Sequence, residues 1–233
     1  MPTAPLGRRE RSKDAKRARI FSAASELFGE RGFEAVTTRE IADRADVAAG
    51  TLFRYAATKS ELLLMVYNDA AVAALELGAE NAARPIGPAD RVLALVEPFI
   101  AEGWRQHENS IVYQRELLFG SPTDVYRAQG LDIIARMERA IAELLLDTLR
   151  PLSEFTSAAD HEIECAARSI FALVHMTIVH PMIRQRGEEH PMDPLGVLRT
   201  QVKIIVAGLS EIGHSRGDLH ASRHNQRRKN DQD

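Results

Sequence analysis

Residues 37–59, TTREIADRADVAAGTLFRYAATK, constrain the fold of this chain more than any other segment. Thr37 and Glu40 have the spacing of a capping box, in which two side chains cap the first turn of a helix reciprocally. A short helix is therefore expected to start at about Thr38, with Ile41, Ala42 and Ala45 on its apolar face. Because a helix of two turns is too short to be stable alone, it needs a neighbour.

A second short helix is predicted from about Ala49 to Tyr55, after a turn at positions 46–48. Two short helices joined by such a turn form a helix-turn-helix, which can place its second helix in the major groove of DNA. The core between the two helices is predicted to contain Ile41, Ala45, Val47 and Leu52.

The remaining positions of the two helices face outward and are the candidates for contact with DNA. Ala49 and Gly50 are small, so they let the backbone approach phosphates or base edges that larger side chains would hold away. Hydroxyl and ammonium groups on the same face can donate to phosphates. The predicted DNA-binding residues are Thr38, Arg39, Ala49, Gly50, Thr51, Phe53, Arg54, Tyr55 and Lys59.

The sequence from about Lys16 to Leu64 carries a longer set of motifs. They are the apolar positions Ile20, Ala24, Leu27 and Phe28 of an amphipathic first helix, Gly32-Phe33 at the end of that helix, TTREIADRADV, GTLFRY, and Thr58-Lys59 followed by Leu62. In these motifs the chain resembles the tetracycline-repressor (TetR) family of ligand-responsive transcription regulators. The resemblance implies DNA contacts at Thr38, Arg39, Gly50, Thr51, Phe53, Tyr55 and Lys59, with Arg39 the best candidate for reading a guanine edge.

Three positions depart from the pattern of that family. Ala48 replaces a frequent serine, so the second helix is capped by Asp46 or not at all. Phe53 replaces a frequent tyrosine and loses a donor, although its ring can still contact a thymine methyl. Ala56 replaces a frequent phenylalanine that packs against the following helix. These changes affect the expected specificity, not the expected class.

Charge is distributed unevenly along the chain. Residues 1–60 contain 12 Lys and Arg against 8 Asp and Glu, net +4, whereas the remaining residues contain 18 against 25, net −7. The basic end is therefore the predicted DNA end. Residues 1–11 are expected to be a basic disordered arm, which either follows the minor groove or phosphates or is only a solvated leader.

The chain after Lys59 has only helical patterns. Thr58 and Glu61 form another capping box for a helix to about Ala83, followed by helices at about 89–107, 110–119, 123–149, 157–186 and 193–212. The fold class is thus all-α. We expect a helix-turn-helix DNA-binding domain at 12–59, a helical ligand-binding and dimerisation domain at 60–212, and a disordered polar tail at 213–233.

Two apolar stripes occur in the last two predicted helices. They are Ile163, Ala167, Ile170, Val174 and Ile178, and Leu198, Val202, Ile205, Leu209 and Ile212. Such stripes serve helix packing, either inside one chain or between two. The resemblance assigns these helices to a four-helix dimer interface, which a protein reading two half-sites requires, so we favour a homodimer.

A pocket for a small-molecule effector is expected within the middle helices. Its candidate lining combines aromatic rings, flexible Met and a few polar groups. These residues are Phe99, Trp104, Tyr113, Phe119, Met137, Phe171, His175 and Met176. Taken singly, each is better explained as ordinary core. A ligand that favours a conformation with wrongly spaced recognition helices would release the dimer from DNA.

An enzyme is the alternative class. His161, Glu162, Glu164, His175 and His180 could form a metal or acid-base cluster, but no known catalytic motif is present. We therefore expect no catalysis, no metal and no cofactor. A ligand-binding helical dimer without DNA binding is a further alternative. The charged N-terminus, the lack of an 18-residue apolar run and the single, expectedly buried Cys165 predict a cytoplasmic protein without a membrane segment.

Overall fold

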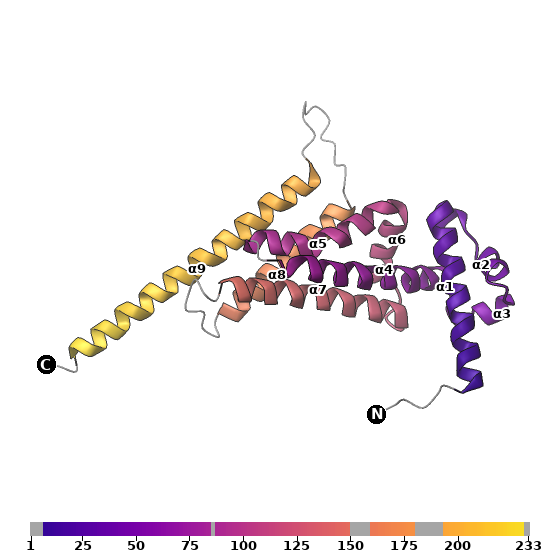
Figure 1. The fold of residues 1–233 in the computed structure, drawn as a ribbon, viewed down its shortest axis with the longest axis horizontal. Helices are drawn as coiled ribbons and strands as arrows, with labels where there is room; N and C mark the ends of the chain where they lie inside the picture. Colours follow the sequence, from indigo (N-terminus) through magenta and orange to yellow (C-terminus); the bar gives the residue numbers. More distant parts are fainter. Residues whose placement is uncertain (1–6, 85–86, 150–158, 180–192, 231–233) are drawn as a thin grey trace. The chain divides into compact units, whose positions relative to one another are not determined.

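The computed structural model describes residues 7–84, 87–149, 159–179 and 193–230, and these residues form helices and connecting turns without strands (Figure 1). This confirms the predicted all-α class. In chain order the helices are α1 Arg8–Ala35, α2 Thr38–Arg44, α3 Ala49–Leu52, α4 Lys59–Ala82, α5 Pro88–Arg105, α6 His107–Phe119, α7 Val125–Leu149, α8 Ala159–Val179 and α9 Pro194–Asn230.

The chain divides into two compact units. The first comprises Met1–Ala73 and Glu102–Ile133, and the second comprises Ala74–Ala101 and Ile134–Asp233. The first unit is larger than the DNA-binding domain predicted at 12–59, because α6 packs against α1 within it. A unit of three helices, two of them short, buries little apolar surface by itself, and the added helices enlarge its core.

Part of the core of the first unit lies between α1, α2 and α3, where the short α2 and α3 lie beside the long α1 (Figure 1). Ile20, Ala24, Leu27 and Phe28 of α1 are buried, as their spacing predicted. Of the predicted core between α2 and α3, Ile41, Ala45 and Leu52 are buried and Val47 is half-buried. This arrangement turns the opposite faces of α2 and α3 toward solvent.

Gly32 breaks α1 close to its end. Its φ of 77° and ψ of 163° lie outside the helical region, in a conformation that side chains with a Cβ disfavour. The chain therefore changes direction here, between the long part of α1 and the start of α2 at Thr38.

The second unit contains the packed pair α8 and α9. All five residues of the α8 stripe are buried, as are Leu198, Val202 and Leu209 of the α9 stripe. Our assignment of these stripes to the dimer interface is therefore wrong for most of their residues, which pack inside one chain. Ile212 is 41% exposed, and Ile205 is half-buried.

Gly78 of α4 marks a close approach of two helices in the second unit. A Cβ placed on Gly78 would lie 2.0 Å from the carbonyl oxygen of Leu95 in α5. No side chain fits this contact, so glycine allows α4 and α5 to cross with backbone against backbone.

The ends of several helices differ from the sequence-based boundaries. The last helix was expected to stop at Ile212, whereas α9 continues through Gly213 to Asn230, so most of the predicted disordered tail is helical. Two glycines, Gly213 and Gly217, lie in this extension; each costs a helix only about 1 kcal/mol, and no proline follows them. α1 already begins at Arg8, inside the predicted disordered arm, and residues 1–6 and 180–186 lie outside the described residues.

Among the described residues, α4 has the length and apolar composition of a membrane-crossing helix. More than half of its most apolar stretch is buried inside the protein, including Leu62, Leu63 and Leu64. These are the properties of a helix that forms a protein core.

Candidate nucleic-acid interface

The start of α2 is fixed by the predicted capping box. The Glu40 backbone N–H donates to Oγ1 of Thr37 over 3.2 Å, and the Thr37 backbone N–H donates to Oε2 of Glu40 over 2.8 Å. Arg31 of α1 donates to the other Glu40 oxygen over 2.7 Å. The hydrogen bond from the Thr37 side chain, followed by that from Arg31, lowers the pKa of Glu40 to about 2. The carboxylate thus holds α2 to the end of α1.

The turn between α2 and α3 depends on Asp46, which has a φ of 51°. Aspartate tolerates this left-handed conformation better than most residues. Its carboxylate bonds Arg19 of α1 at 3.0 Å. The N-cap of α3 is Ala48, and no side chain caps the helix. Of the two possibilities that the sequence left open, the structure has the helix without a side-chain cap.

Residues 49–55 form what we call the recognition segment. It consists of α3 and a turn in which the Tyr55 N–H donates to the Leu52 carbonyl over 2.8 Å. Leu52 is fully buried, and this single anchor orients the other side chains outward. Ala49, Gly50, Phe53 and Arg54 are exposed, and Thr51 and Tyr55 are half-buried.

Gly50 has no structural requirement for glycine within the chain. A Cβ placed on it would meet no atom within 4 Å, and its φ is not positive. The absence of a side chain leaves this part of the recognition segment open to an approaching surface.

The arginines of the first unit fall into two groups. Arg19 pairs with Asp46 in the turn after α2, and Arg31 and Arg44 pair with carboxylates of neighbouring helices. Arg39 and Arg54 are exposed and form no ion pair among the described residues. The two arginines predicted to contact DNA thus belong, with Arg11 and Arg17, to the exposed arginines of this unit that form no ion pair within the described residues.

Two further side chains that were predicted to contact DNA form hydrogen bonds inside the protein. The Lys59 ammonium donates to the carbonyls of Phe33 and Val36 over 2.9 and 3.1 Å and lies 4.2 Å from the centre of the Phe33 ring. The Tyr55 hydroxyl donates to the carbonyl of Lys13 in α1 over 3.2 Å. Both side chains thus fasten the recognition segment and α4 to α1, and a phosphate contact from either stays a prediction.

Sequence reasoning missed two amides that hold α1 at its break. Asn109 of α6 accepts from the Phe33 N–H over 2.6 Å and donates to the Phe28 carbonyl over 2.8 Å, so it replaces the helical bonds lost at Gly32. Gln106 donates to the Gly29 carbonyl over 2.6 Å. These contacts join positions more than 70 residues apart, and no local pattern marks them.

Comparison with known proteins agrees with this geometry. Residues 20–66 match the model of the bacterial regulatory proteins of the tetR family, which covers α2, α3 and their supports in α1 and α4. Over these residues the match confirms the resemblance to the TetR family found in the sequence. The proteins of this family are named as regulators, which agrees with the expectation that this chain is not an enzyme.

Individual TetR-family proteins are similar over different lengths. The transcriptional repressor KstR of Mycobacterium tuberculosis is 43% identical over 67 residues, which cover 28% of this chain and 30% of that protein. The transcriptional activator FasR of Mycolicibacterium smegmatis is 43% identical over 54 residues, covering 23% and 25%. The matches to these two relatives therefore span a third of their length or less.

A solved TetR-family structure extends the similarity to most of the chain. The transcriptional repressor FadR of Thermus thermophilus, solved in complex with lauroyl-CoA, superposes with a TM-score of 0.62 at 25% identity. The alignment covers 82% of this chain and 93% of FadR.

The residues predicted to line a TetR-type effector pocket are divided between the two units. Trp104, Tyr113 and Phe119 belong to the first unit, and Phe99, Met137, Phe171, His175 and Met176 belong to the second. Tyr113 and Met137 are buried, whereas Phe119 is 81% exposed and Met176 is 48% exposed. The last two therefore face solvent in this structure.

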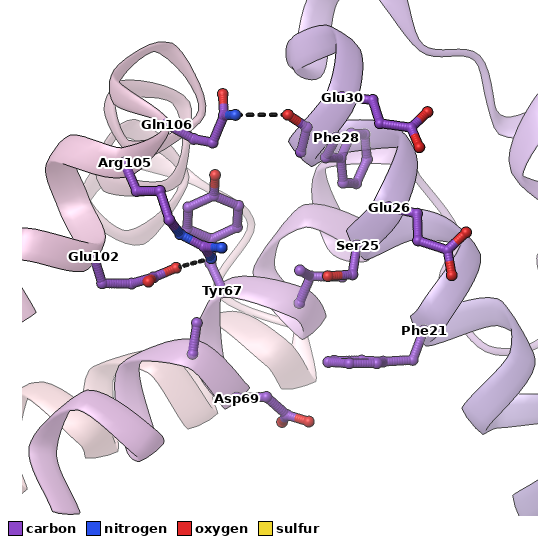
Figure 2. Close-up of a pocket in the computed structure, with 13 residues that line it drawn as sticks. Phe21, Ser25, Glu26, Phe28, Glu30, Tyr67, Asp69, Glu102, Arg105 and Gln106 are labelled. Atoms are coloured by element: carbon purple, nitrogen blue, oxygen red, sulfur yellow. Dashed lines mark hydrogen bonds and ion pairs between the residues drawn. The ribbon is translucent and has the colours of Figure 1, made fainter. Parts of the chain in front are cut away.

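The first unit contains a cavity of about 520 Å³ that includes none of these eight residues. Figure 2 shows Phe21, Ser25 and Phe28 of α1 opposite Tyr67 of α4 and Arg105 of α5. Arg105 is paired with Glu102, and burial raises the pKa of Tyr67 to about 12. A second hollow, of about 470 Å³, lies between α7 and α8 and also lacks the predicted residues.

The residues considered for the alternative enzyme class do not assemble a metal site. Within the described part of the chain, no three His, Cys, Asp or Glu side chains are grouped to hold a metal ion. His180 lies outside that part. Cys165 is exposed, which contradicts its expected burial, and its sulfur lies 3.7 Å from Nε2 of His161. The apolar face of α8 passes through Ile163 and Ala167 and leaves position 165 outside.

Proposed function

We propose that this protein is a TetR-family transcriptional repressor that binds an inverted-repeat operator as a dimer and leaves it when a small-molecule effector binds. The observation that supports this most is the surface of α2 and the recognition segment. It combines an open backbone at Gly50 with two arginines, Arg39 and Arg54, that the fold leaves unpaired among the described residues.

The chemistry of this surface suits a major groove. A guanidinium can donate two hydrogen bonds to the O6 and N7 atoms of guanine, and Arg39 lies at the exposed start of α2. Phe53 is 48% exposed and offers an apolar surface to a thymine methyl. Thr38 and Thr51 are half-buried and present hydroxyls suited to phosphates.

A dimer is required because two half-sites lie about 34 Å apart and a single recognition segment reads only one. The apolar stripes of α8 and α9 are used inside the chain, so we assign the interface to the solvent-facing sides of the same helices. Met176, Ile204 and Ile212 are 48%, 65% and 41% exposed there. Ala172, Ala207 and Gly208 are exposed between them and allow close helix packing.

For the effector we propose the class of long-chain acyl-CoA thioesters. The support is the Thermus thermophilus FadR structure, which contains lauroyl-CoA and aligns with 82% of this chain. The eight residues named from the sequence stay candidates for its site. A cytoplasmic location follows from binding to chromosomal DNA and from an effector of intracellular metabolism.

The first experiment is capture of sheared DNA from the source genome by the purified protein, followed by sequencing. An enriched inverted repeat is expected, and Arg39→Ala should weaken its binding by about 1–3 kcal/mol per half-site and relax one base preference. Arg139→Ala removes an exposed arginine of α7 and is the matched control.

The same assay separates the remaining possibilities. Release of the captured repeat by lauroyl-CoA, and not by free coenzyme A, would support the effector class. Absence of any enriched sequence, with and without lauroyl-CoA, would refute the regulator and leave a ligand-binding helical protein. Ile204→Asp should convert a dimer to monomers in sedimentation analysis, whereas Leu77→Asp on exposed α4 surface should not.

A further inference from the structure

A buried set of polar side chains ends on the backbone of the recognition segment. The Tyr126 hydroxyl donates to the Tyr55 carbonyl over 3.1 Å. The Tyr126 carbonyl accepts from Nδ2 of Asn68 over 2.8 Å, and Oδ1 of Asn68 accepts from the Tyr113 hydroxyl over 2.9 Å. Three helices, α4, α6 and α7, thus contribute to one hydrogen-bonded chain inside the first unit.

Tyr126 is a well-fixed donor. It is 7% exposed, and Asp124 Oδ1 accepts from its backbone N–H over 2.8 Å at the start of α7. The next residue, Arg127, donates from Nε to the carbonyl of Leu117 in α6 over 2.9 Å. Because the backbone on both sides of the phenol is held, the hydroxyl can occupy only a small region.

The Tyr55 carbonyl is an acceptor in need of a partner. It lies where the recognition segment ends, and the last carbonyls of a helix have no partner in the helix itself. No backbone amide among the described residues donates to it. The Tyr126 hydroxyl therefore supplies a bond that the segment cannot form alone.

The recognition segment has few other restraints. α3 contains four residues, its N-cap lacks a side-chain hydrogen bond, and Leu52 is its one buried side chain. The Tyr55 side chain is held by α1 through the Lys13 carbonyl. Tyr126 adds a second restraint from α7 that acts on the main chain.

We infer that the Tyr126 hydroxyl is a positioning group that fixes the recognition segment in its DNA-reading orientation; its effect on DNA binding rests on the proposed function. Because this hydroxyl comes from α7, the bond makes that orientation depend on the position of the start of α7. A shift of that part of α7 would thus reach the recognition segment without altering any residue on the DNA surface.

Two matched variants test this inference. Tyr126→Phe removes the hydroxyl that reaches Tyr55, and Tyr113→Phe removes a hydroxyl from the far end of the same set while leaving the Tyr126–Tyr55 bond. Hydrogen exchange of the free protein is measured for peptides covering residues 49–57. A typical hydrogen bond corresponds to a factor of about 3–10, so exchange should accelerate by that factor in Tyr126→Phe and not in Tyr113→Phe.

DNA binding provides the readout that a merely structural role would not change. Tyr126→Phe should weaken operator binding about 3–10-fold per half-site with unchanged affinity for random DNA. Tyr113→Phe should lower the unfolding midpoint, because it leaves a buried acceptor unsatisfied, but keep operator affinity.

Each other outcome overturns the inference. Unchanged exchange in Tyr126→Phe would show that the hydroxyl restrains nothing. Equal acceleration in both variants would indicate general loosening of the first unit. Accelerated exchange with unaltered operator affinity would separate the restraint from recognition. The exchange measurement needs no DNA. A wild-type protein that selects no operator would therefore refute the proposed function, whereas the exchange rates would still show whether Tyr126 restrains the recognition segment.

Discussion

Replacing Gly50 with alanine should stabilise the protein and weaken its binding to DNA at the same time. The added Cβ has no protein atom within 4 Å and the backbone has no positive φ, so the folded state gains no clash. Alanine also lowers the conformational entropy of the unfolded chain, which raises the free energy of unfolding by about 0.4–1 kcal/mol. For a chain of this size the thermal midpoint should rise by about 1–4 °C.

On DNA the same methyl group has the opposite effect. If the recognition segment enters the groove with Gly50 against it, a methyl there holds the backbone away from several contacts at once. We expect operator affinity to fall at least about tenfold per half-site, which corresponds to about 1.4 kcal/mol.

Calorimetry and operator titration of one protein preparation measure both effects. Gly29→Ala is the control, because Gly29 is also exposed in a helix of the first unit with nothing within 4 Å of its Cβ. It should give the same stabilisation and leave affinity unchanged. A stabilised Gly50→Ala protein with wild-type affinity would refute the reasoning, because the open surface at Gly50 would then not face DNA.

Three further outcomes follow from contacts around the recognition segment. Lys59→Met should lower the free energy of unfolding, measured in urea, by about 1–3 kcal/mol, because two carbonyls lose their donor. A variant that keeps its stability but binds DNA with a weaker salt dependence would instead indicate that Lys59 contacts a phosphate. Ala48→Ser should supply the missing cap of α3 and raise the unfolding midpoint, by about 1 kcal/mol in free energy. The lowered pKa of Glu40 contributes stability above its ordinary value of 4.5, and this contribution is lost as the pH falls toward about 2. The difference in stability between wild type and Glu40→Gln should therefore disappear over that pH range, and a difference independent of pH would contradict the assignment.

Sequence reasoning succeeded where a structural feature depends on residues close together in the chain. The capping box of Thr37 and Glu40 lies within four residues, and the structure contains both of its hydrogen bonds. The apolar face of α1 follows from helical spacing in the same way.

It failed where a feature depends on what a helix face meets. The periodic stripes of α8 and α9 showed correctly that one face is buried, but periodicity does not distinguish a neighbouring helix from a second copy. Asn109 gave no signal, because its role at Gly32 arises only when α6 reaches α1. The candidate pocket residues were chosen by type, and residue type alone could not show that Phe119 faces solvent.

The backbone contact at Gly78 has a consequence for how relatives of this protein diverge. The Leu95 carbonyl would lie 2.0 Å from any Cβ at position 78. Relatives that keep this crossing of α4 and α5 therefore accept no residue other than glycine at that position. Position 50 is open space within the protein, so under the proposed function only DNA restricts it. A lineage that changes its operator should therefore accumulate substitutions at position 50 while position 78 remains glycine.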